Sequence, residues 1–430
     1  MRAIPRIERV NGRLKAPPSA ACTLTSIVLA SMSDGPTTIH GSLDMDESRY
    51  LVDALRRIGV EVAGTFRDGL TIGDRVGISA NDVELDIADA SGAIPYLIGM
   101  LTFTPGHFLL KGRDQSRDWS AVLVEPLRNL GAEIDYRGEE GRLPMQIRGK
   151  VTRGGMEIAV DHTISGEFLS AIMMGVPRMR GGVDLVLHQP LPPSSRLTQR
   201  LLEEFGGIAE NADSNTLKIS APAMTRKNYM VEGDFSAGAY WLALAAAAGG
   251  ELSVEGLPVD SAQPEAAIVG ILERLGVSLT VSEGTVALSA AGHPQGGRID
   301  CASSPGLVPI LAAVAPSFAG PLTLAGLTDL VAREPQLIKA LQSALETLGV
   351  TSSLSGDQFT VQPGWDASPA TIDPGGDPRL VMAFALAGLL RGSVSVEDEQ
   401  AVAHTYPRFW RTLDEIVSSS AALHSTGLTP

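Results

Sequence analysis

The chain has 430 residues, more than one hydrophobic core usually serves, so its length indicates two domains. A formal charge of -15 and a pI near 4.9 argue against general attraction to nucleic acid or to an anionic membrane, both of which bind clustered Lys and Arg. No apolar run reaches the ~18 residues that a membrane-spanning helix needs. We therefore expect a protein that binds neither nucleic acid nor membrane. Two cysteines, Cys22 and Cys301, are too few for a disulfide framework and indicate a reducing cytoplasm.

One pattern recurs along the chain: an amphipathic helix that closes on a large apolar residue, followed by Gly and a short alternating strand. It is seen, for example, in VDALRRIGVEV, VEPLRNLGAEI and ILERLGVSLT. The glycines that follow these helices are Gly59, Gly131, Gly206, Gly276 and Gly349. A glycine at this position can take the left-handed conformation that ends a helix. A sixth helix, FWRTLDEIVSS, keeps the spacing but lacks the glycine.

The amphipathic helices recur about every 70 residues, and a second helix, rich in small residues, recurs at the same spacing. Examples are IPYLIGMLT, AYWLALAAAA and MAFALAGLL, which are apolar nearly all round and are therefore expected to be buried. The sequence thus predicts an α/β fold of six repeats, three in each domain, with each buried helix packing against neighbouring repeats. We place one domain at residues 15–230 and a discontinuous one at residues 1–14 plus 231–430.

The local sequence resembles the EPSP synthase family, the 3-phosphoshikimate 1-carboxyvinyltransferases, along nearly the whole chain. The stretches that carry the resemblance include LASMSDGPTTIHGSLDMDESRYLVDALRRIGVEV, EGDFSAGAYWLALAAAA and DPRLVMAFALAGLLRGSVSVEDEQ. The resemblance implies a two-domain inside-out α/β barrel of six βαβαββ-like repeats, with a ligand cleft between the domains. It also implies a monomeric transferase that moves the enolpyruvyl group of phosphoenolpyruvate to a hydroxyl of shikimate 3-phosphate, without a metal or organic cofactor.

Such chemistry needs cations for two phosphorylated, carboxylated substrates and an acid/base pair for proton transfer. By the resemblance, several positions where the family has these cations hold uncharged residues here, namely Ala20, Thr25, Pro95 and Leu337. The family's catalytic Asp falls on Gly306, and its Ser-Ser-Gln triplet reads Ser165, Gly166 and Glu167. The cleft therefore differs from the family pattern while the scaffold motifs persist.

The resemblance assigns substrate binding to the residues that still match or replace polar family positions: Arg117, Ser165, Ser194, Arg333, Glu334 and Arg379. For proton transfer it leaves Glu167 and His404, where the family has Gln and Lys. Glu167 suits a base if its pKa is raised, and a histidine titrates near neutrality. Two structural readings stay open: Glu167 as an acid that stabilises a helix N-terminus, and His404 as a packed histidine.

Each charge-assisted hydrogen bond lost to a buried anion costs roughly 1.5–3 kcal/mol. We therefore expect an enzyme of secondary metabolism that acts on a small, anionic, shikimate-like cyclic carboxylate, by elimination or group transfer at a ring hydroxyl, with weakened or lost use of phosphoenolpyruvate. Two alternatives remain: a divergent 3-phosphoshikimate 1-carboxyvinyltransferase, and a catalytically inactive homologue with a binding or regulatory role. The seven histidines are scattered along the sequence and show no metal-ligand spacing, so we expect no metal site.

Overall fold

The chain divides into two compact units, which a computed structural model describes over most of their length. Unit 1 comprises Met1–Pro17 and Gly233–Pro430, and unit 2 comprises Pro18–Glu232. The residues described are 1–73, 80–113, 118–151, 154–161, 164–179, 181–403 and 405–425. Within these ranges, no helix combines the length and the apolar character that spanning a membrane requires.

Each unit contains three small sheets among its described residues. The strands of unit 2 are β3 (Thr37–His40), β4 (Val62–Thr65), β5 (Gly69–Ile72), β6 (Ala80–Asp86), β7 (Gly106–Lys111), β8 (Glu133–Tyr136), β9 (Met145–Gly149), β10 (Met156–Val160), β11 (Val183–Leu187), β12 (Ile208–Asn211), β13 (Thr216–Ser220) and β14 (Asn228–Met230). They form sheets in the orders β14–β3–β5–β4, β6–β7–β9–β8 and β10–β11–β13–β12.

The sheets of unit 1 draw on both ends of the chain. Its strands are β1 (Arg2–Ile4), β2 (Val10–Lys15), β15 (Gly250–Glu255), β16 (Ser278–Ser282), β17 (Thr285–Ala290), β18 (Gly297–Asp300), β19 (Leu322–Ala325), β20 (Ser352–Ser355), β21 (Gln358–Val361), β22 (Ala370–Ile372) and β23 (Val394–Val396). Their orders are β16–β17–β15–β2, β18–β19–β21–β20 and β1–β23–β22. The N-terminal strands β1 and β2 thus pair with strands more than 200 residues away in sequence.

The four-stranded sheets share one plan, in which a parallel strand pair is continued by antiparallel strands. In unit 2, β10 and β11 run parallel while β11, β13 and β12 are antiparallel. In unit 1, β18 and β19 run parallel while β19, β21 and β20 are antiparallel. The recurrence of this plan in both units is what the spacing of the sequence repeats predicts.

Two sets of helices accompany the sheets, as the sequence predicts. The helices rich in small residues are α1 (Ala20–Ser31), α3 (Ile94–Thr102), α5 (Gly166–Gly175), α7 (Phe235–Ala248), α9 (Val308–Val314) and α12 (Pro378–Arg391). The amphipathic helices are α2 (Asp46–Arg57), α4 (Glu125–Asn129), α6 (Pro193–Glu204), α8 (Ile268–Arg274), α11 (Pro335–Thr347) and α13 (Phe409–Ser425). Short connecting elements are α10 (Thr328–Arg333), the π-helical turn η2 (Ser120–Val124), and the 3-10 turns η1 (Ser91–Ala93), η3 (Val176–Arg178), η4 (Pro264–Ala267), η5 (Pro305–Leu307), η6 (Ala315–Ser317) and η7 (Glu399–Ala403).

The recurring glycines end the amphipathic helices as expected. Gly59, Gly131, Gly206, Gly276 and Gly349 follow the last residues of α2, α4, α6, α8 and α11, with φ angles between 72° and 107°. L-residues with a Cβ rarely adopt this region, whereas glycine enters it at little cost. The predicted helix stops are therefore confirmed at all five positions.

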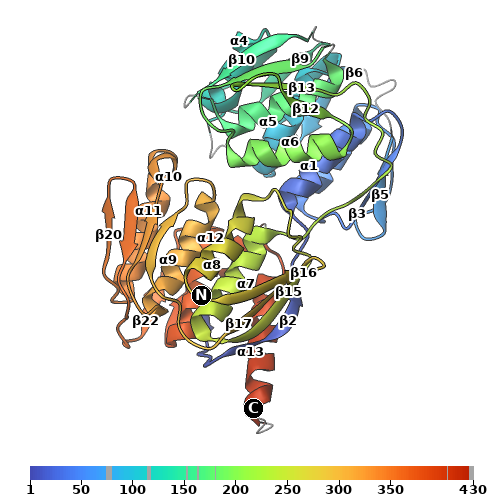
Figure 1. The fold of residues 1–430 in the computed structure, drawn as a ribbon. Helices are drawn as coiled ribbons and strands as arrows, with labels where there is room; N and C mark the ends of the chain where they lie inside the picture. Colours follow the sequence, from blue (N-terminus) through green and yellow to red (C-terminus); the bar gives the residue numbers. More distant parts are fainter. Residues whose placement is uncertain are drawn as a thin grey trace. The chain divides into compact units, whose positions relative to one another are not determined.

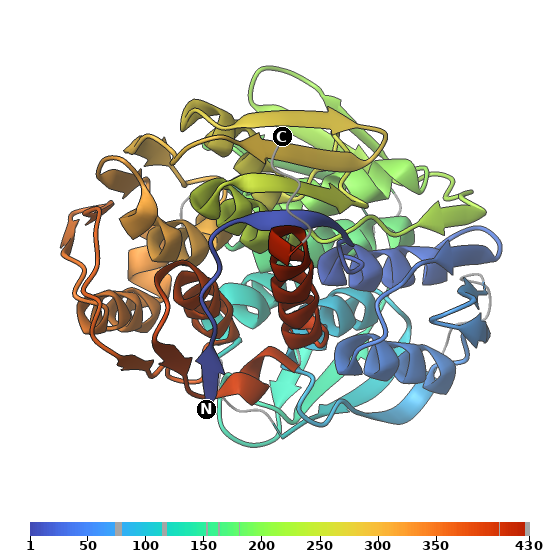
Figure 2. The same ribbon diagram turned by 90° about the horizontal axis from the view of Figure 1, so that it is seen from below.

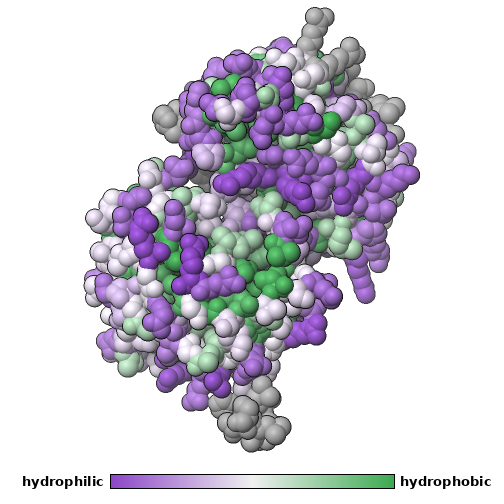
Figure 3. Space-filling view, viewed as in Figure 1, coloured by the Kyte–Doolittle hydropathy of each residue, from purple (hydrophilic) through white to green (hydrophobic). Residues whose placement is uncertain are grey.

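The small-residue helices form the interior of each unit. Figure 1 shows α7, α9 and α12 packed side by side within unit 1. On the face drawn in Figure 3, hydrophobic residues gather over α7 and α8. The burial of these apolar helices is the main favourable contribution to folding.

The sixth amphipathic helix, α13, packs against the N-terminal strand β2 (Figure 2). The hydroxyl of Ser419 donates a 2.9 Å hydrogen bond to the carbonyl oxygen of Asn11. At the start of α13, Phe409 is fully buried and stacks on Trp241 of α7, with ring centroids 5.4 Å apart. These contacts tie both ends of the described chain into unit 1.

Candidate active site

Four helices of unit 2 meet around a pocket of about 130 Å³. It is lined by Ala21 and Thr25 of α1, Pro95 and Tyr96 of α3, Glu167, Ser170 and Met174 of α5, and Ser194, Leu197 and Thr198 of α6. Several of these residues lie in the first turns of their helices. The resemblance points to the same place, since it maps cation positions onto Thr25 and Pro95.

The lining of this pocket carries hydroxyl groups and one carboxyl group but no cation. Among the described residues that line it, none is Lys, Arg or His, and Glu167 is the one with a formal charge at neutral pH. Thr25 is only 2% exposed and hydrogen-bonds the phenol of Tyr96. Burial raises the pKa of Tyr96 to about 12 against the opposing effect of that hydrogen bond, so the phenol stays neutral. The described lining therefore offers a ligand neutral hydroxyl groups and one carboxyl group.

The predicted binding residue Ser165 begins α5 rather than facing the pocket. Its hydroxyl accepts a 3.1 Å hydrogen bond from the N–H of Phe168 and donates to the carbonyl oxygen of Val122. The residue is 3% exposed, and its hydroxyl serves as the N-cap of α5. The predicted substrate contact of Ser165 stays a prediction.

Ser194, by contrast, lines the pocket, and its hydroxyl lies where Gly166 has no side chain. A Cβ placed on Gly166 would be 2.2 Å from the hydroxyl oxygen of Ser194, a distance that no pair of non-bonded atoms tolerates. The hydroxyl thus occupies the volume that a side chain at position 166 would fill. The structure brings Ser194 and Glu167 together in one pocket, as their predicted roles require.

Glu167 lies in the first turn of α5 and is partly buried. A carboxylate there interacts favourably with the helix dipole, which is the structural reading of this residue. Its place in the pocket lining is also what a proton-transferring group needs. Its catalytic role therefore stays a prediction with both readings open.

A second polar cluster lies in unit 1 at the start of α12. Nη2 of Arg379 is 2.6 Å from a carboxylate oxygen of Glu334 and 2.7 Å from one of Asp377. Burial lowers the pKa of Arg379, but its hydrogen bonds to Asp377 and Glu334 outweigh this and raise that pKa above its usual value. Asp377 also caps α12 by accepting from the N–H of Arg379. Two predicted ligand contacts, Arg379 and Glu334, are thus paired with each other, and an anionic ligand would have to compete for the guanidinium.

The remaining predicted residues are less constrained by the structure. Arg333 is exposed at the end of α10, next to Glu334 in sequence. Arg117 and His404 lie outside the described residues, so their predicted roles stay predictions. Within the part of the chain that the structure describes, no three His, Cys, Asp or Glu side chains gather as a metal-ligand set.

Sequence reasoning missed three hydroxyls in the pocket of unit 2, those of Tyr96, Ser170 and Thr198. The hydroxyl of Thr198 donates a 3.0 Å hydrogen bond to that of Ser170, which connects α6 to α5. The available signal was their polarity in the first half of helices α3, α5 and α6. Spacing alone does not reveal that these helices converge.

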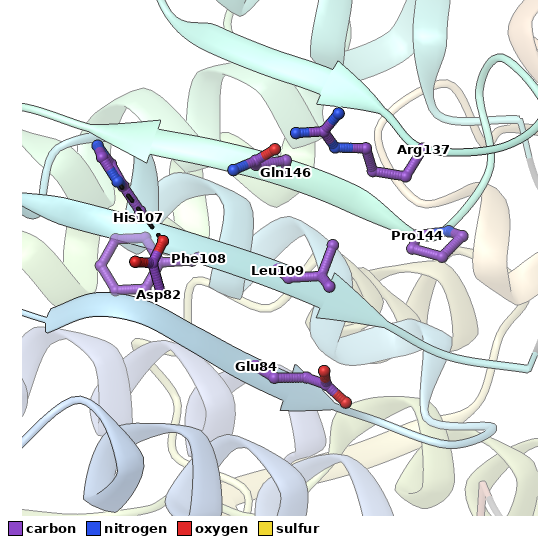
Figure 4. A pocket seen from close by; sticks show the side chains of 8 residues that line it. All are labelled: Asp82, Glu84, His107, Phe108, Leu109, Arg137, Pro144 and Gln146. Atoms are coloured by element: carbon purple, nitrogen blue, oxygen red, sulfur yellow. Dashed lines mark ion pairs between the residues drawn. The ribbon is translucent and has the colours of Figure 1, made fainter.

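A larger pocket of about 450 Å³ lies on the open face of the β6–β7–β9–β8 sheet (Figure 4). Its lining includes an ion pair in which Nδ1 of His107 is 3.7 Å from a carboxylate oxygen of Asp82. Both side chains are strongly exposed, at 51% and 85%, so the pair contributes little to stability. We interpret this pocket as the solvated face of the sheet.

Two solved structures of enolpyruvyl transferases share this architecture. EPSP synthase from Acinetobacter baumannii matches with a TM-score of 0.81 at 22% identity, covering 96% of this chain and 97% of that one. The enolpyruvyl transferase NikO from Streptomyces tendae matches with a TM-score of 0.71 at 16% identity, covering 96% of each chain. The fold is thus that of the enolpyruvyl transferases, which confirms the predicted inside-out α/β architecture.

The sequence comparisons identify the family. The family model for EPSP synthase (3-phosphoshikimate 1-carboxyvinyltransferase) matches residues 4–413. The 3-phosphoshikimate 1-carboxyvinyltransferase of Methanosphaerula palustris is 30% identical over 406 residues, covering 93% of this chain and 95% of that protein. That of Burkholderia multivorans is 30% identical over 416 residues, with the same coverage. The chain belongs to the EPSP synthase family and is accordingly a carboxyvinyltransferase-type enzyme.

Proposed function

We propose that this EPSP synthase-family enzyme acts on a small shikimate-like cyclic carboxylate and has weakened or lost use of phosphoenolpyruvate. The reaction is an elimination or a group transfer at a ring hydroxyl, and its setting is secondary metabolism. The observation that carries the proposal is the pocket of unit 2, whose described lining residues offer hydroxyls and the Glu167 carboxyl but no cation.

Phosphate groups are the costliest part of the family's substrates to bind in this pocket. A phosphate that leaves water must be compensated by charge-assisted hydrogen bonds, each worth about 1.5–3 kcal/mol. The neutral hydroxyls of Thr25 and Tyr96 offer weaker bonds, and Glu167 repels a dianion. A ring that carries hydroxyls in place of phosphate avoids both costs.

The residues predicted from the sequence take the remaining roles in the proposed reaction. Glu167 and His404 are the candidates for proton transfer. Ser165, Ser194, Arg117, Arg333, Glu334 and Arg379 are the candidates for ligand binding. We further propose that the enzyme works as a monomer in the cytoplasm, where its buried thiols Cys22 and Cys301 stay reduced.

One alternative has a specific observation in its favour. The curated relatives, including that of Methanosphaerula palustris at 30% identity, are 3-phosphoshikimate 1-carboxyvinyltransferases. Under this alternative the chain is a divergent synthase whose substrate cations come from other positions. The two functions differ in which ring acid binds more tightly.

Calorimetric titration of the full chain with shikimate, shikimate 3-phosphate and phosphoenolpyruvate separates these functions. We expect shikimate to bind at least about tenfold more tightly than shikimate 3-phosphate, a difference of about 1.4 kcal/mol. An EPSP synthase from a relative, titrated in parallel, serves as the control with the opposite preference. Tighter binding of the phosphorylated ring would refute the proposal in favour of the divergent synthase, and binding of neither ring acid would favour an inactive homologue.

A further inference from the structure

In unit 1 the carboxyl group of Glu265 lies directly against Gly306. Glu265 belongs to the turn η4 that precedes α8, and Gly306 belongs to the turn η5 that precedes the buried helix α9. A Cβ placed on Gly306 would be 2.4 Å from Oε1 of Glu265. The carboxyl group therefore fills the volume that a side chain at position 306 would occupy.

The surroundings of this carboxyl group disfavour its charged form. Burial is the main cause that raises the pKa of Glu265, and the nearby carboxylate of Asp234 raises it further. Hydrogen bonds from its own backbone N–H and from the hydroxyl of Ser236 act in the opposite direction without cancelling the rise. Among the described residues, the phenol of Tyr240 on α7 also interacts with this carboxyl group. The turn η5 contributes no titratable side chain.

Gly306 does not need to be glycine for its backbone, because its φ lies outside the left-handed region. The Glu265 side chain would have to move to admit a side chain at position 306. Part of the Glu265 residue is exposed to solvent. The carboxyl group of Glu265 thus lies beside position 306, where glycine leaves no side chain of its own.

We propose that Glu265 is the proton-transferring carboxyl of unit 1, supplied by η4 to the volume left open at Gly306. The role rests on the proposed function, since it assigns a proton donor for a ring hydroxyl. In the step, the O–H bond of the Glu265 carboxyl breaks and a new O–H bond forms on the departing hydroxyl oxygen. The C–O bond to that oxygen breaks and the oxygen leaves as water, while the C–H bond on the neighbouring ring carbon gives its electron pair to a new C=C bond and its proton to solvent. Solvent then returns a proton to the Glu265 carboxylate.

The first test needs no ligand and measures thermal stability against pH. A carboxyl group whose folded pKa is raised stabilises the fold fully below its unfolded pKa of about 4.3, and this contribution is lost as the pH rises through the folded value. Glu265→Gln stays uncharged at every pH. Relative to wild type, the Tm of Glu265→Gln should therefore rise by about 2 °C or more between about pH 5 and pH 8.

The matched control is Glu273→Gln, an exposed glutamate on α8, directly after η4. Its Tm should follow that of wild type at both pH values. A Glu265→Gln curve that runs parallel to wild type would overturn the proposal, because a carboxyl that ionises normally cannot hold a proton near neutrality.

The second test uses shikimate as the probe. Calorimetric titration at about pH 7 in two buffers of different ionisation enthalpy measures the protons exchanged on binding. We expect wild type to exchange a fraction of a proton and Glu265→Gln to bind with that exchange abolished. The double variant Glu265→Ala with Gly306→Asp returns a carboxyl group to the same volume and should restore the exchange.

The titration distinguishes a failure of the proposed role of Glu265 from a failure of the proposed function. Equal proton exchange by wild type and Glu265→Gln would contradict the role of Glu265 while leaving shikimate binding intact. If wild type does not bind shikimate, the proposed function fails, and the comparison of Tm against pH alone decides whether Glu265 holds a proton.

Discussion

Replacing Glu167 by glutamine should raise the affinity for shikimate 3-phosphate on the order of tenfold relative to that for shikimate, or about 1.4 kcal/mol. Glu167 carries the formal charge among the described residues that line the pocket of unit 2. Its carboxylate repels a phosphate dianion more strongly than it repels a ring with one carboxylate. Glutamine keeps the shape of the side chain and removes the charge. The ratio of the two dissociation constants, measured by calorimetry, is the readout.

Ser170→Ala is the matched control for this variant. Ser170 lies on the same helix and lines the same pocket, but its loss changes no charge. Its hydroxyl accepts from Thr198, so the substitution should weaken both ring acids to a similar degree. An unchanged affinity ratio in Glu167→Gln would show that the phosphate binds away from this carboxylate, against our interpretation of the pocket.

Replacing Trp241 by alanine should destabilise unit 1 by about 3–5 kcal/mol, the usual cost of removing a large buried aromatic side chain. Trp241 lies in α7, is 1% exposed, and stacks on Phe409 of α13. Its indole N–H also donates a 3.3 Å hydrogen bond to the hydroxyl of Tyr406. The substitution therefore removes apolar contacts, leaves a cavity and deprives Tyr406 of its donor. The free energy of unfolding, from urea denaturation followed by circular dichroism, measures the loss.

Trp410→Ala tests whether burial causes that loss. Trp410 also packs on Phe409, with ring centroids 5.0 Å apart, but it is only partly buried. Its indole N–H donates a 2.8 Å hydrogen bond to the carbonyl oxygen of Glu399. We expect a smaller loss, about 1–2 kcal/mol. An equal or greater loss than in Trp241→Ala would be inconsistent with a core centred on α7.

The scaffold could be predicted from the sequence because its signals are local and repeated. The glycine after each amphipathic helix is dictated by the left-handed turn at that point, as Gly276 after α8 illustrates with its φ of 88°. The small-residue helices are apolar on all faces, as α7 shows, and burial is their one stable setting. Neither feature depends on which distant residue lies opposite.

The candidate site was harder to predict because its geometry depends on side chains that reach across elements. The hydroxyl of Ser194 fills the volume beside Gly166, and the carboxyl of Glu265 fills the volume beside Gly306. In each case a group from another segment replaces a side chain that the chain lacks locally. Sequence spacing does not predict such a contact. Position 306 taken alone shows only that a glycine stands where the family has an aspartate.

The pairing of Arg379 was not predicted. Asp377 precedes Arg379 by two residues, and an Asp just before a helix indicates a cap. That Glu334, 45 residues away, supplies the second carboxylate follows from the packing of unit 1. Two residues predicted as separate ligand contacts are therefore bound to each other in the structure.

Phosphate release measures most directly whether this chain still uses phosphoenolpyruvate as a substrate. The purified chain is given phosphoenolpyruvate with shikimate 3-phosphate, beside an EPSP synthase from a relative under the same conditions. We predict release at least about a hundredfold slower than in the control, a difference of about 2.7 kcal/mol in the barrier. Release at a comparable rate would contradict the proposed loss of phosphoenolpyruvate use and show that this chain is a working 3-phosphoshikimate 1-carboxyvinyltransferase.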